Sequence, residues 1–274
     1  MSNKLPSMLI NGLETDQASV LDRGFQYGDG LFETIHVLAG KPQYWREHME
    51  RLFDGCRQLK ISLPELSVLE NESESLCSGV DDGVLKIIIT RGMGGRGYAA
   101  DGSLKSTRVL AIFSAPHYPD EYRSEGVVVK VCETRLGLNP SLAGIKHLNR
   151  LEQVLARAEW TSTDIQEGLM LDINNNVIEG TMCNVFSVIK GELYTPELSL
   201  CGVKGIMREQ VIGAARQANI VVHEAQMSLD DFYQSEECFL SNSLFGIWPV
   251  RQLAGHEFTL GPVSHQLFSI LQKK

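Results

Sequence analysis

Lys146 has a sequence setting in which its amine could form a Schiff base. Lys146 lies in Leu142-Ala-Gly-Ile-Lys-His-Leu-Asn-Arg150, between a loop that contains Asn139-Pro140 and a predicted amphipathic helix. A lysine that forms a Schiff base must be partly desolvated, so that its amine is neutral at the working pH. The apolar neighbours Ile145 and Leu148 could provide that environment. The other interpretation is a solvated lysine at a helix start, which is the usual situation of a lysine.

A carboxylate and a helix start follow along the chain. Glu179 lies in Val177-Ile-Glu-Gly, just before a turn and an apolar strand. It is either a surface turn residue or a buried partner for a cationic ring nitrogen. Gly205-Ile-Met-Arg208 opens a predicted helix, where backbone N–H groups and the helix dipole favour a phosphate. Arg51, on the polar side of an earlier helix, could add a charge-assisted clamp.

Glycines recur between two predicted strands, in Arg91-Gly-Met-Gly-Gly-Arg96-Gly-Tyr98. The stretch satisfies the pattern GxGxxG, but a dinucleotide site also needs a helix that starts on the third glycine and an acidic residue about 20 positions later. Because the loop continues into a second strand, we reject this interpretation. The alternatives are a flexible hairpin tip and a loop that carries Arg96 and Tyr98 over a pocket to bind an anion; we favour the second.

Hydrophobic periodicity predicts the elements that must position these residues. A helix is predicted from Trp45, and strands over 84–90 and 108–113 flank the glycine-rich loop. Residues 114–126 contain two prolines and no periodicity, which is typical of a linker. The other predicted elements are strands at 7–11, 32–38, 127–131, 168–173, 183–189, 219–224 and 237–242, helices at 148–160 and 206–218, and a closing helix.

These elements predict an α+β chain of two domains. The first domain covers 1–118 and carries the hairpin with the glycine-rich loop; the second covers 125–274 and carries Lys146, with the linker at about 114–126. A length of 274 residues agrees with two domains of ordinary size. Apolar residues make up 43% of the chain, which is enough for a core in each domain.

Charge and cysteine content narrow the classes of function. The net charge is −9, and no basic stripe typical of a nucleic-acid-binding protein is visible, although a local basic pocket for a small anion is compatible with it. The six cysteines form no CxxC pair and the histidines no HExxH motif, so neither a disulfide framework nor a metal site is predicted. No apolar run approaches the ~20 residues of a membrane span, and the N-terminus does not resemble a signal peptide. A soluble, cytoplasmic protein that binds neither membrane nor nucleic acid is expected.

Taken together, the candidate residues resemble the fold-type IV pyridoxal-phosphate enzymes, which include the branched-chain and D-amino-acid aminotransferases and the aminodeoxychorismate lyases. The resemblance implies the two-domain fold of that family. It runs from near residue 10 to near residue 250, with 33 residues from Lys146 to Glu179. The matching stretches are Asp22–Thr34, Glu47–Leu52, Lys146, Val177–Phe186, Gly205–Arg208 and Glu237–Ser243.

The resemblance implies a pyridoxal 5′-phosphate cofactor and a role for each candidate residue. Lys146 would form the Schiff base, and Glu179 would pair with the pyridinium nitrogen and keep it protonated, which makes the ring an electron sink. The phosphate would be held by Arg51, the backbone N–H groups of Ile206 and Met207, and the Ser243 hydroxyl. The family's members are dimers, so a homodimer is expected, in which a loop such as Arg91–Tyr98 completes the partner's site.

Two stretches, Arg91–Tyr98 and Arg135–Gln153, resemble the lyase branch of the family. The aminotransferases commonly place a tyrosine shortly after the catalytic lysine, whereas Asn149-Arg150 stand in that region here. By resemblance, the reaction converts 4-amino-4-deoxychorismate to 4-aminobenzoate and pyruvate, a step toward folate. Lys146 would be the base, and Thr34 would assist protonation. The candidates to bind the two substrate carboxylates are Arg96, Tyr98 and Arg150.

Two alternatives compete with the lyase. An aminotransferase of the same fold, acting on branched-chain or D-amino acids, would use the same Lys146, Glu179 and Arg51. It would convert its cofactor to the pyridoxamine form with an amino acid, which a lyase should not do efficiently. A protein that binds the cofactor without chemistry is the alternative from another class, and it predicts that Lys146 is dispensable. His36 and His48 are interpreted as packing or solvent-facing residues.

Overall fold

The computed structural model describes residues 7–100, 102 and 104–272, which form two compact units. Unit 1 comprises the described residues up to Pro116 together with Ile145–Asn149. Unit 2 comprises His117–Gly144 and the chain from Arg150 onward. The division after Pro116 falls inside the segment 114–126 that the sequence predicts to be a linker.

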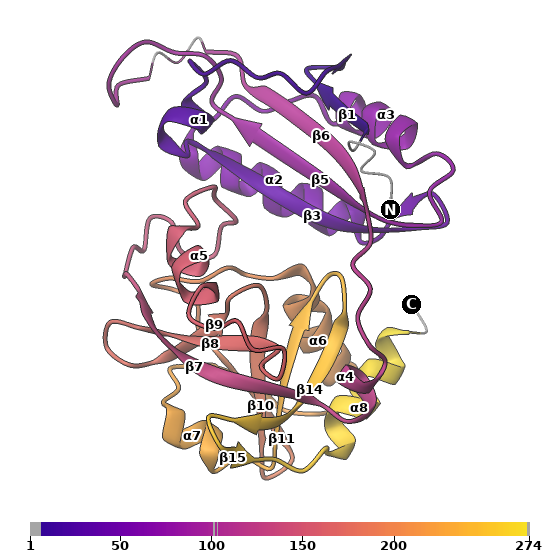
Figure 1. The fold of residues 1–274 in the computed structure, drawn as a ribbon, viewed down its shortest axis with the longest axis vertical. Helices are drawn as coiled ribbons and strands as arrows, with labels where there is room; N and C mark the ends of the chain where they lie inside the picture. Colours follow the sequence, from indigo (N-terminus) through magenta and orange to yellow (C-terminus); the bar gives the residue numbers. More distant parts are fainter. Residues whose placement is uncertain (1–6, 101, 103, 273–274) are drawn as a thin grey trace. The chain divides into compact units, whose positions relative to one another are not determined.

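Unit 1 is built on an antiparallel sheet with the strand order β2-β1-β6-β5-β3-β4 (Figure 1). β3 and β5 pair along the whole of β3, from Gly30 opposite Thr90 to Leu38 opposite Asp82. Successive residues of a strand face opposite sides of the sheet, and the buried side of β3 carries every second residue from Leu31. The strands are β1 (Ser7–Ile10), β2 (Leu13–Glu14), β3 (Gly30–Leu38), β4 (Lys41–Pro42), β5 (Asp82–Thr90) and β6 (Thr107–Ser114).

Helices pack on this sheet, α2 against β3 and α3 against β1, β5 and β6. α2 lies on the side of β3 that carries Leu31, because a Cβ atom at Gly55 of α2 would lie 2.9 Å from the Leu31 side chain. The helices of unit 1 are α1 (Arg23–Tyr27), α2 (Trp45–Leu59) and α3 (Leu66–Cys77). The buried residues of α2 are His48, Met49, Leu52, Gly55 and Cys56.

Unit 2 is built on a mixed sheet with the strand order β12-β11-β10-β13-β14-β7-β8-β9, and β15 pairs with β14. The pairs β7–β8, β7–β14 and β11–β12 are parallel. The strands are β7 (Val127–Leu136), β8 (Glu167–Asp172), β9 (Val177–Gly180), β10 (Asn184–Ile189), β11 (Glu192–Pro196), β12 (Val222–Ala225), β13 (Glu237–Asn242), β14 (Gly246–Leu253) and β15 (His256–Glu257).

The core of unit 2 includes an aromatic cluster around Trp248. Ring centroids of Tyr118, Tyr122 and Phe245 lie 4.8, 5.2 and 3.7 Å from the Trp248 ring. The predicted linker is therefore packed into unit 2 after Pro116, and it contains a short helix. The helices of this unit are α4 (Glu121–Ser124), α5 (Leu151–Arg157), α6 (Ile206–Gln217), α7 (Leu229–Tyr233) and α8 (Pro262–Leu271).

Most predicted elements agree with the structure. The predicted strands correspond to β1, β3, β5, β6, β7, β8, β10, β12 and β13, and the helices from 45, from 206 and at the end to α2, α6 and α8. The helix predicted over 148–160 is wrong at its start: it begins only at Leu151, because residues 145–149 hydrogen-bond to β3. The same contacts correct the domain prediction, since they place Lys146 in unit 1 and not with the C-terminal half.

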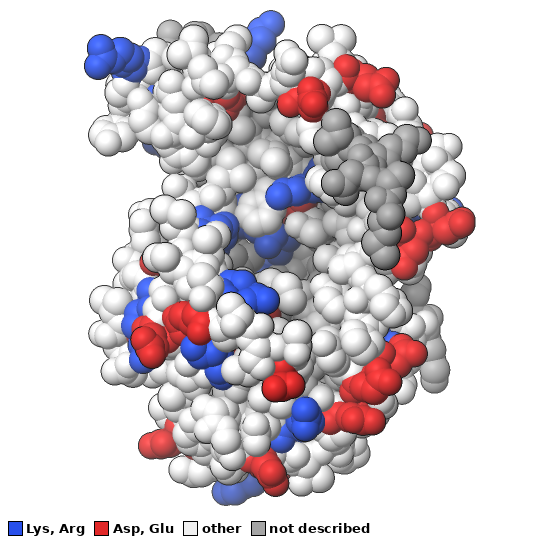
Figure 2. All heavy atoms as spheres, in the orientation of Figure 1, with Lys and Arg blue, Asp and Glu red and all other residues white. Residues whose placement is uncertain are grey.

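The cysteines, the charged surface residues and the helices bear on the classes of site that the sequence excludes. All six cysteines lie in the described part of the chain and are buried free thiols. Acidic and basic side chains lie in small, mixed groups on the face shown in Figure 2. Over residues 7–100, 102 and 104–272, no helix is long and apolar enough to cross a membrane, and no group of three or more acidic, histidine or cysteine side chains is placed to hold a metal ion.

Candidate active site

The segment Ile145–Asn149 lies beside β3 and places Lys146 opposite Phe32. Phe32 N donates a hydrogen bond to Lys146 O at 2.9 Å, and Leu148 N donates to Gly30 O at 3.0 Å. Residues directly opposite each other in an antiparallel pair share a face of the sheet. The Lys146 side chain accordingly lies over Phe32, with Nζ 4.4 Å from the centroid of the ring.

Thr34 faces the same side of β3 as Phe32, two residues further along the strand. Lys86 of β5 lies opposite Thr34, and its Nζ is 5.5 Å from the Phe32 ring centroid. This side of the sheet therefore carries the predicted base, Lys146, and the predicted proton donor, Thr34, together with a second amine.

The other side of β3 carries a buried ion cluster that sequence reasoning missed. The Glu33 and His48 side chains are each 1% exposed. Arg51 Nε donates to Glu33 Oε1 at 2.8 Å, Arg51 Nη2 also binds Glu33 Oε2, and His48 Nδ1 lies 2.6 Å from Oε2. Burial raises the pKa of the Glu33 carboxyl, but Arg51 and His48 outweigh this effect and hold the pKa at about 2. His48 is buried, which agrees with its interpretation as a packing residue, and the structure adds its contact with the Glu33 carboxylate.

Arg51 reaches Glu33 from α2, on the opposite side of β3 from the Lys146 side chain. The two bonds to one carboxylate fix the plane of the guanidinium. The role of Arg51 as a phosphate ligand stays a prediction, and the structure adds Glu33 as the residue that orients it.

Arg96 and Tyr98 lie on the loop between β5 and β6. Both side chains are exposed, Tyr98 to 87%. The two strands pair as an antiparallel hairpin that closes with Thr90 opposite Thr107. The glycines therefore connect two paired strands, which is the expected hairpin, and the role of Arg96 and Tyr98 in binding an anion stays a prediction.

In unit 2, Glu179 lies on β9 and is buried, with 5% exposure. Its Oε2 atom accepts a hydrogen bond from Val203 N at 2.8 Å, and Oε1 accepts one from Gln153 Nε2 at 3.3 Å. Hydrogen bonds donated to a carboxylate favour its charged form. Of the two interpretations given above, the buried carboxylate agrees with the structure and the surface turn residue does not.

α5 and the residue before it supply neighbours of Glu179. Burial lowers the pKa of the Arg150 guanidinium, although the Glu179 and Glu152 carboxylates oppose this effect. Gln153 Oε1 is buried and has no hydrogen-bond partner among the described residues. A buried acceptor without a donor costs free energy, so this atom marks a place where a bound molecule can supply one.

The start of α6 lies close to Glu179 through one short segment. Gly205 is the N-cap, and no side chain caps the helix, so the N–H groups of its first turn have no acceptor within it. Asn184 Nδ2 donates to Val203 O at 2.9 Å, and a Cβ atom at Gly205 would lie 2.1 Å from Asn184 Oδ1. Because Val203 N binds Glu179, the segment 203–207 connects the carboxylate with the predicted phosphate ligands Ile206 and Met207.

Ser243 lies in the turn between β13 and β14. The turn is closed by Asn242 Oδ1, which accepts hydrogen bonds from Leu244 N and Phe245 N, both at 2.9 Å. The end of β13 lies beside β10, with Ser241 opposite Asn184. The turn therefore follows the strand that neighbours Asn184, and the Ser243 hydroxyl stays a predicted phosphate ligand.

This set of residues fits pyridoxal 5′-phosphate. Unit 1 provides an amine beside an aromatic ring, at Lys146 and Phe32. Unit 2 provides a buried carboxylate, an unpartnered amide oxygen on Gln153 and an uncapped helix N-terminus, and such a terminus is a common phosphate site. Within its own unit, each group has the chemistry that one part of the cofactor requires: an amine for the aldehyde, a carboxylate for the ring nitrogen and free helix N–H groups for the phosphate.

Sequence reasoning missed Glu33, Asn184 and Gln153 as functional residues. All three lie in stretches that resemble the family, so the signal was present, but no role was assigned to them. Their partners are distant in sequence: Glu33 binds a histidine 15 positions away, and Gln153 binds a glutamate 26 positions away. Only the fold brings these pairs together.

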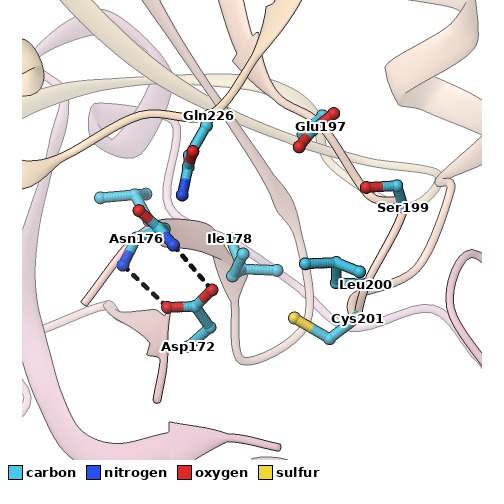
Figure 3. Close-up of a pocket in the computed structure, with 9 residues that line it drawn as sticks. Asp172, Asn176, Ile178, Glu197, Ser199, Leu200, Cys201 and Gln226 are labelled. Carbon is cyan, nitrogen blue, oxygen red and sulfur yellow. Dashed lines mark hydrogen bonds between the residues drawn. The ribbon is translucent and has the colours of Figure 1, made fainter. Parts of the chain in front are cut away.

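A small pocket in unit 2 is lined by residues at the start of β9 and by neighbouring segments, and none of the predicted site residues lines it (Figure 3). Asp172 Oδ1 accepts hydrogen bonds from the N atoms of Asn174 and Asn176, and its Oδ2 accepts one from Asn176 Nδ2. Its carboxylate is therefore committed to the turn before β9. The lining residues are Asp172, Asn176, Val177, Ile178, Glu197, Ser199, Leu200, Cys201 and Gln226.

Comparison with known proteins identifies the family. The model of the class IV aminotransferases matches residues 30–253. Aminodeoxychorismate lyase of Vibrio harveyi is 37% identical over 94% of this chain and 97% of its own. A putative branched-chain-amino-acid aminotransferase of Methanocaldococcus jannaschii is 31% identical over 90% of this chain and 87% of its own.

The solved structures agree with this assignment. The crystal structure of 4-amino-4-deoxychorismate lyase from Pseudomonas aeruginosa superposes with a TM-score of 0.94 and 42% sequence identity, covering 97% of this chain and 98% of that one. The predicted fold-type IV architecture is thereby confirmed, as is the family resemblance. The chain belongs to the class IV aminotransferase family, whose members depend on pyridoxal phosphate.

Proposed function

We propose that this protein is a pyridoxal-phosphate-dependent lyase that converts 4-amino-4-deoxychorismate to 4-aminobenzoate and pyruvate. The observation that carries the proposal is the match to the Pseudomonas aeruginosa lyase, at 42% identity over nearly the whole of both chains. Arg150, which stands where the aminotransferases commonly have a tyrosine, supports it, since Arg150 lies near Glu179 in unit 2.

The proposal assigns the cofactor to the groups described above. Lys146 would bind its aldehyde carbon, the Glu179 carboxylate would keep a proton on its ring nitrogen, and Arg51 and the first turn of α6 would hold its phosphate. When bound, the cofactor supplies an electron sink for the bond that breaks at the substrate. The phosphate ligands are Arg51, Ile206 N, Met207 N and Ser243 Oγ.

Two residues of unit 1 move the protons. Lys146 Nζ removes the proton from the ring carbon that bears the substrate amine. The C–O bond to the enolpyruvyl group then breaks, the ring becomes aromatic, and the departing group takes up a proton to become pyruvate. Thr34, on the same side of β3 as Lys146, is the residue that we assign to this last step: its hydroxyl donates a proton to the departing group and regains one from Lys146 Nζ. No other reactant is needed for the balance.

Three residues, Arg96, Tyr98 and Arg150, would bind the two carboxylates of the substrate. They form a local cationic site on a chain whose net charge is −9. Arg150 is partly buried, so its charge is poorly screened and favours an anion. Arg96 and Tyr98 lie on the exposed loop and can approach a bound molecule. A carboxylate bound by a guanidinium fork forms a strong, directional pair.

The proposal includes a homodimer in the cytoplasm. Leu151, Val154 and Leu155 on α5 are 75, 59 and 60% exposed in the single chain, which is a large apolar face for a helix of one unit. A second copy of the chain is the partner that the family resemblance predicts for such a face. The six buried free thiols agree with a reducing compartment.

A paired assay separates the lyase from the aminotransferase that the Methanocaldococcus jannaschii relative represents. One sample receives 4-amino-4-deoxychorismate, and the other receives branched-chain or D-amino acids with 2-oxoglutarate. The lyase predicts pyruvate and 4-aminobenzoate in the first and only slow conversion of the cofactor to its pyridoxamine form in the second. The opposite result would assign the protein to the aminotransferases.

A further inference from the structure

We propose that Arg23 is a positioning residue, which holds the loop of Arg96 and Tyr98 in the conformation that binds the substrate carboxylates. This inference rests on the proposed function, because it concerns how the same substrate is recognised. Arg23 opens α1 and is 3% exposed, whereas the loop that it contacts is exposed.

The Arg23 guanidinium donates hydrogen bonds to the backbone of the two residues that follow Arg96. Nη1 donates to Gly97 O at 2.9 Å, and Nη2 donates to Tyr98 O at 3.1 Å. Gly97 has a φ of +89°, and a Cβ atom there would meet nothing within 4 Å, so side-chain packing at this position does not fix the loop. Two hydrogen bonds from one rigid guanidinium supply that restraint.

The Asp29 carboxylate connects Arg23 with Arg91, the first residue of the loop. Asp29 Oδ2 accepts hydrogen bonds from Arg23 Nε at 2.9 Å and from Arg91 Nε at 2.7 Å. Arg91 is in turn fixed to the end of α2, since it donates to Leu59 O at 2.8 Å and to Lys60 O at 2.7 Å. Asp29 thus connects the start of the loop, at Arg91, with Gly97 and Tyr98 through Arg23.

Tyr27 adds a second contact from α1. Gly97 N donates to the Tyr27 hydroxyl at 3.2 Å, and the Tyr27 and Tyr98 rings meet edge to face at 5.6 Å. The Arg23 guanidinium carbon lies 5.0 Å from the Tyr27 ring centroid. α1 therefore holds Gly97 and Tyr98 in place, while the side chain of the preceding residue, Arg96, stays exposed.

The test combines Arg23→Gln with Arg96→Gln in a double-mutant cycle. Arg23→Gln is expected to raise the KM for 4-amino-4-deoxychorismate about tenfold and to change kcat by less than about threefold, because it disorders a binding loop without touching the base. In the Arg96→Gln background, the same substitution should change KM by less than about threefold, since the charged side chain through which it acts is gone and Tyr98 alone remains. Equal effects in both backgrounds would overturn the proposal.

A second readout does not depend on activity. Trypsin cleaves after Arg96, and mass spectrometry reports the rate at that bond; Arg23→Gln should raise this rate about tenfold, as local opening becomes more frequent. Arg46→Gln is the matched control, because Arg46 forms only an exposed ion pair with Glu50 and should leave the rate and KM unchanged. An unchanged cleavage rate in Arg23→Gln would contradict the inference.

Tyr27→Phe keeps the test decisive if Arg23→Gln does not fold, because it removes only the hydroxyl that accepts from Gly97 N. It should raise the cleavage rate after Arg96 by about threefold, and a rate equal to that of the wild type would count against the proposal. If the wild-type protein makes no 4-aminobenzoate, the proposed function fails, while the cleavage rates still report whether Arg23 and Tyr27 hold the loop.

Discussion

Glu33 is the residue on which the arrangement around Arg51 depends most. It is buried between Arg51 and His48, and a buried pair that loses one partner leaves an uncompensated charge. Glu33→Gln is therefore expected to lower the free energy of unfolding at pH 7 by about 3 kcal/mol. It should also weaken the binding of pyridoxal phosphate, because Arg51 loses its orientation. Denaturant unfolding and cofactor titration measure the two effects.

The pH dependence of this effect has a defined sign. The pKa of Glu33 is lowered from 4.5 to about 2, so its stabilisation is fully present above about pH 4.5 and is lost as the pH falls toward 2. The difference in stability between wild type and Glu33→Gln should accordingly shrink over that range. Glu50→Gln, in an exposed pair with Arg46, should show almost no difference at any pH. A constant difference down to pH 2 would contradict the assignment.

Glu167 is the opposite case, a buried carboxyl whose neighbours are hydrogen-bond donors and not cations. Burial raises its pKa, although Thr181, Gly168 N and Cys183 donate hydrogen bonds to it. The folded state then holds a proton that the unfolded state has released, so stability falls as the pH rises above 4.5. Glu167→Gln should remove this decline, so its stability relative to the wild type should increase as the pH rises above 4.5.

Thermal unfolding across that pH range measures the effect at Glu167. Glu121→Gln, at an exposed position at the start of α4, is the control and should follow the wild type. Parallel pH profiles of wild type and Glu167→Gln would contradict the account.

For single residues, the sequence predicted the candidate site residues better than it predicted the side chains that they contact. Lys146, Glu179 and the start of α6 stand out by type and setting, and the structure shows where each of them lies, while their roles stay predictions. Glu33 stands next to Thr34 in a matching stretch, but nothing local shows that it faces α2. Its burial depends on the alternation of β3 and on a helix that begins 12 residues later, which is a property of the fold.

Among the elements, the start of α6 gives the sharpest prediction. An alanine side chain at Gly205 would collide with Asn184 and displace the segment that leads into the first turn. Gly205→Ala is expected to weaken pyridoxal 5′-phosphate binding about tenfold, equivalent to about 1.4 kcal/mol, while the affinity for pyridoxal, which lacks the phosphate, changes little. Titrations of the apoprotein with both compounds measure the ratio.

Gly213→Ala is the matched control in the same helix. A Cβ atom at Gly213 meets nothing within 4 Å, so alanine fits there. The substitution should raise the free energy of unfolding by about 0.5–1 kcal/mol, as glycine is a poor helix former, and leave cofactor binding unchanged. Equal losses of affinity in the two variants would mean that the phosphate is bound elsewhere.

Elements with a strong repeat were predictable, and those defined by distant pairing were not. The α2 helix follows from its apolar stripe, and the hairpin of β5 and β6 from its two β-branched runs. Residues 145–149 continue the helical pattern of α5 in sequence, yet they pair with β3, more than a hundred residues earlier. Local periodicity carries no information about such a partner.

For the whole molecule, the exposed face of α5 predicts how copies of the chain associate. Val154→Lys would place a charge in the centre of the face formed by Leu151, Val154 and Leu155. The wild type should sediment at twice the 30.4 kDa of one chain, and the variant as a monomer at micromolar concentration. Ile173→Lys, at another exposed apolar residue of unit 2, should remain a dimer. A monomeric wild type would contradict the homodimer.

The two-part organisation was predictable from composition and from the break at residues 114–126, whereas the return of the chain to unit 1 at Ile145–Asn149 was not. A return of five residues is too short to leave a composition signal. It nevertheless carries Lys146, so the most consequential residue lies where the sequence is least informative about tertiary contacts.

The central claim is that Lys146 performs a lyase reaction on 4-amino-4-deoxychorismate. The most direct measurement supplies the pyridoxal-phosphate-loaded protein with this substrate, made in place from chorismate by a synthase, and quantifies both products over time. The account predicts equal amounts of 4-aminobenzoate and pyruvate from the wild type and neither from Lys146→Ala. Absence of both products from cofactor-loaded wild type, or their undiminished formation by Lys146→Ala, would contradict it.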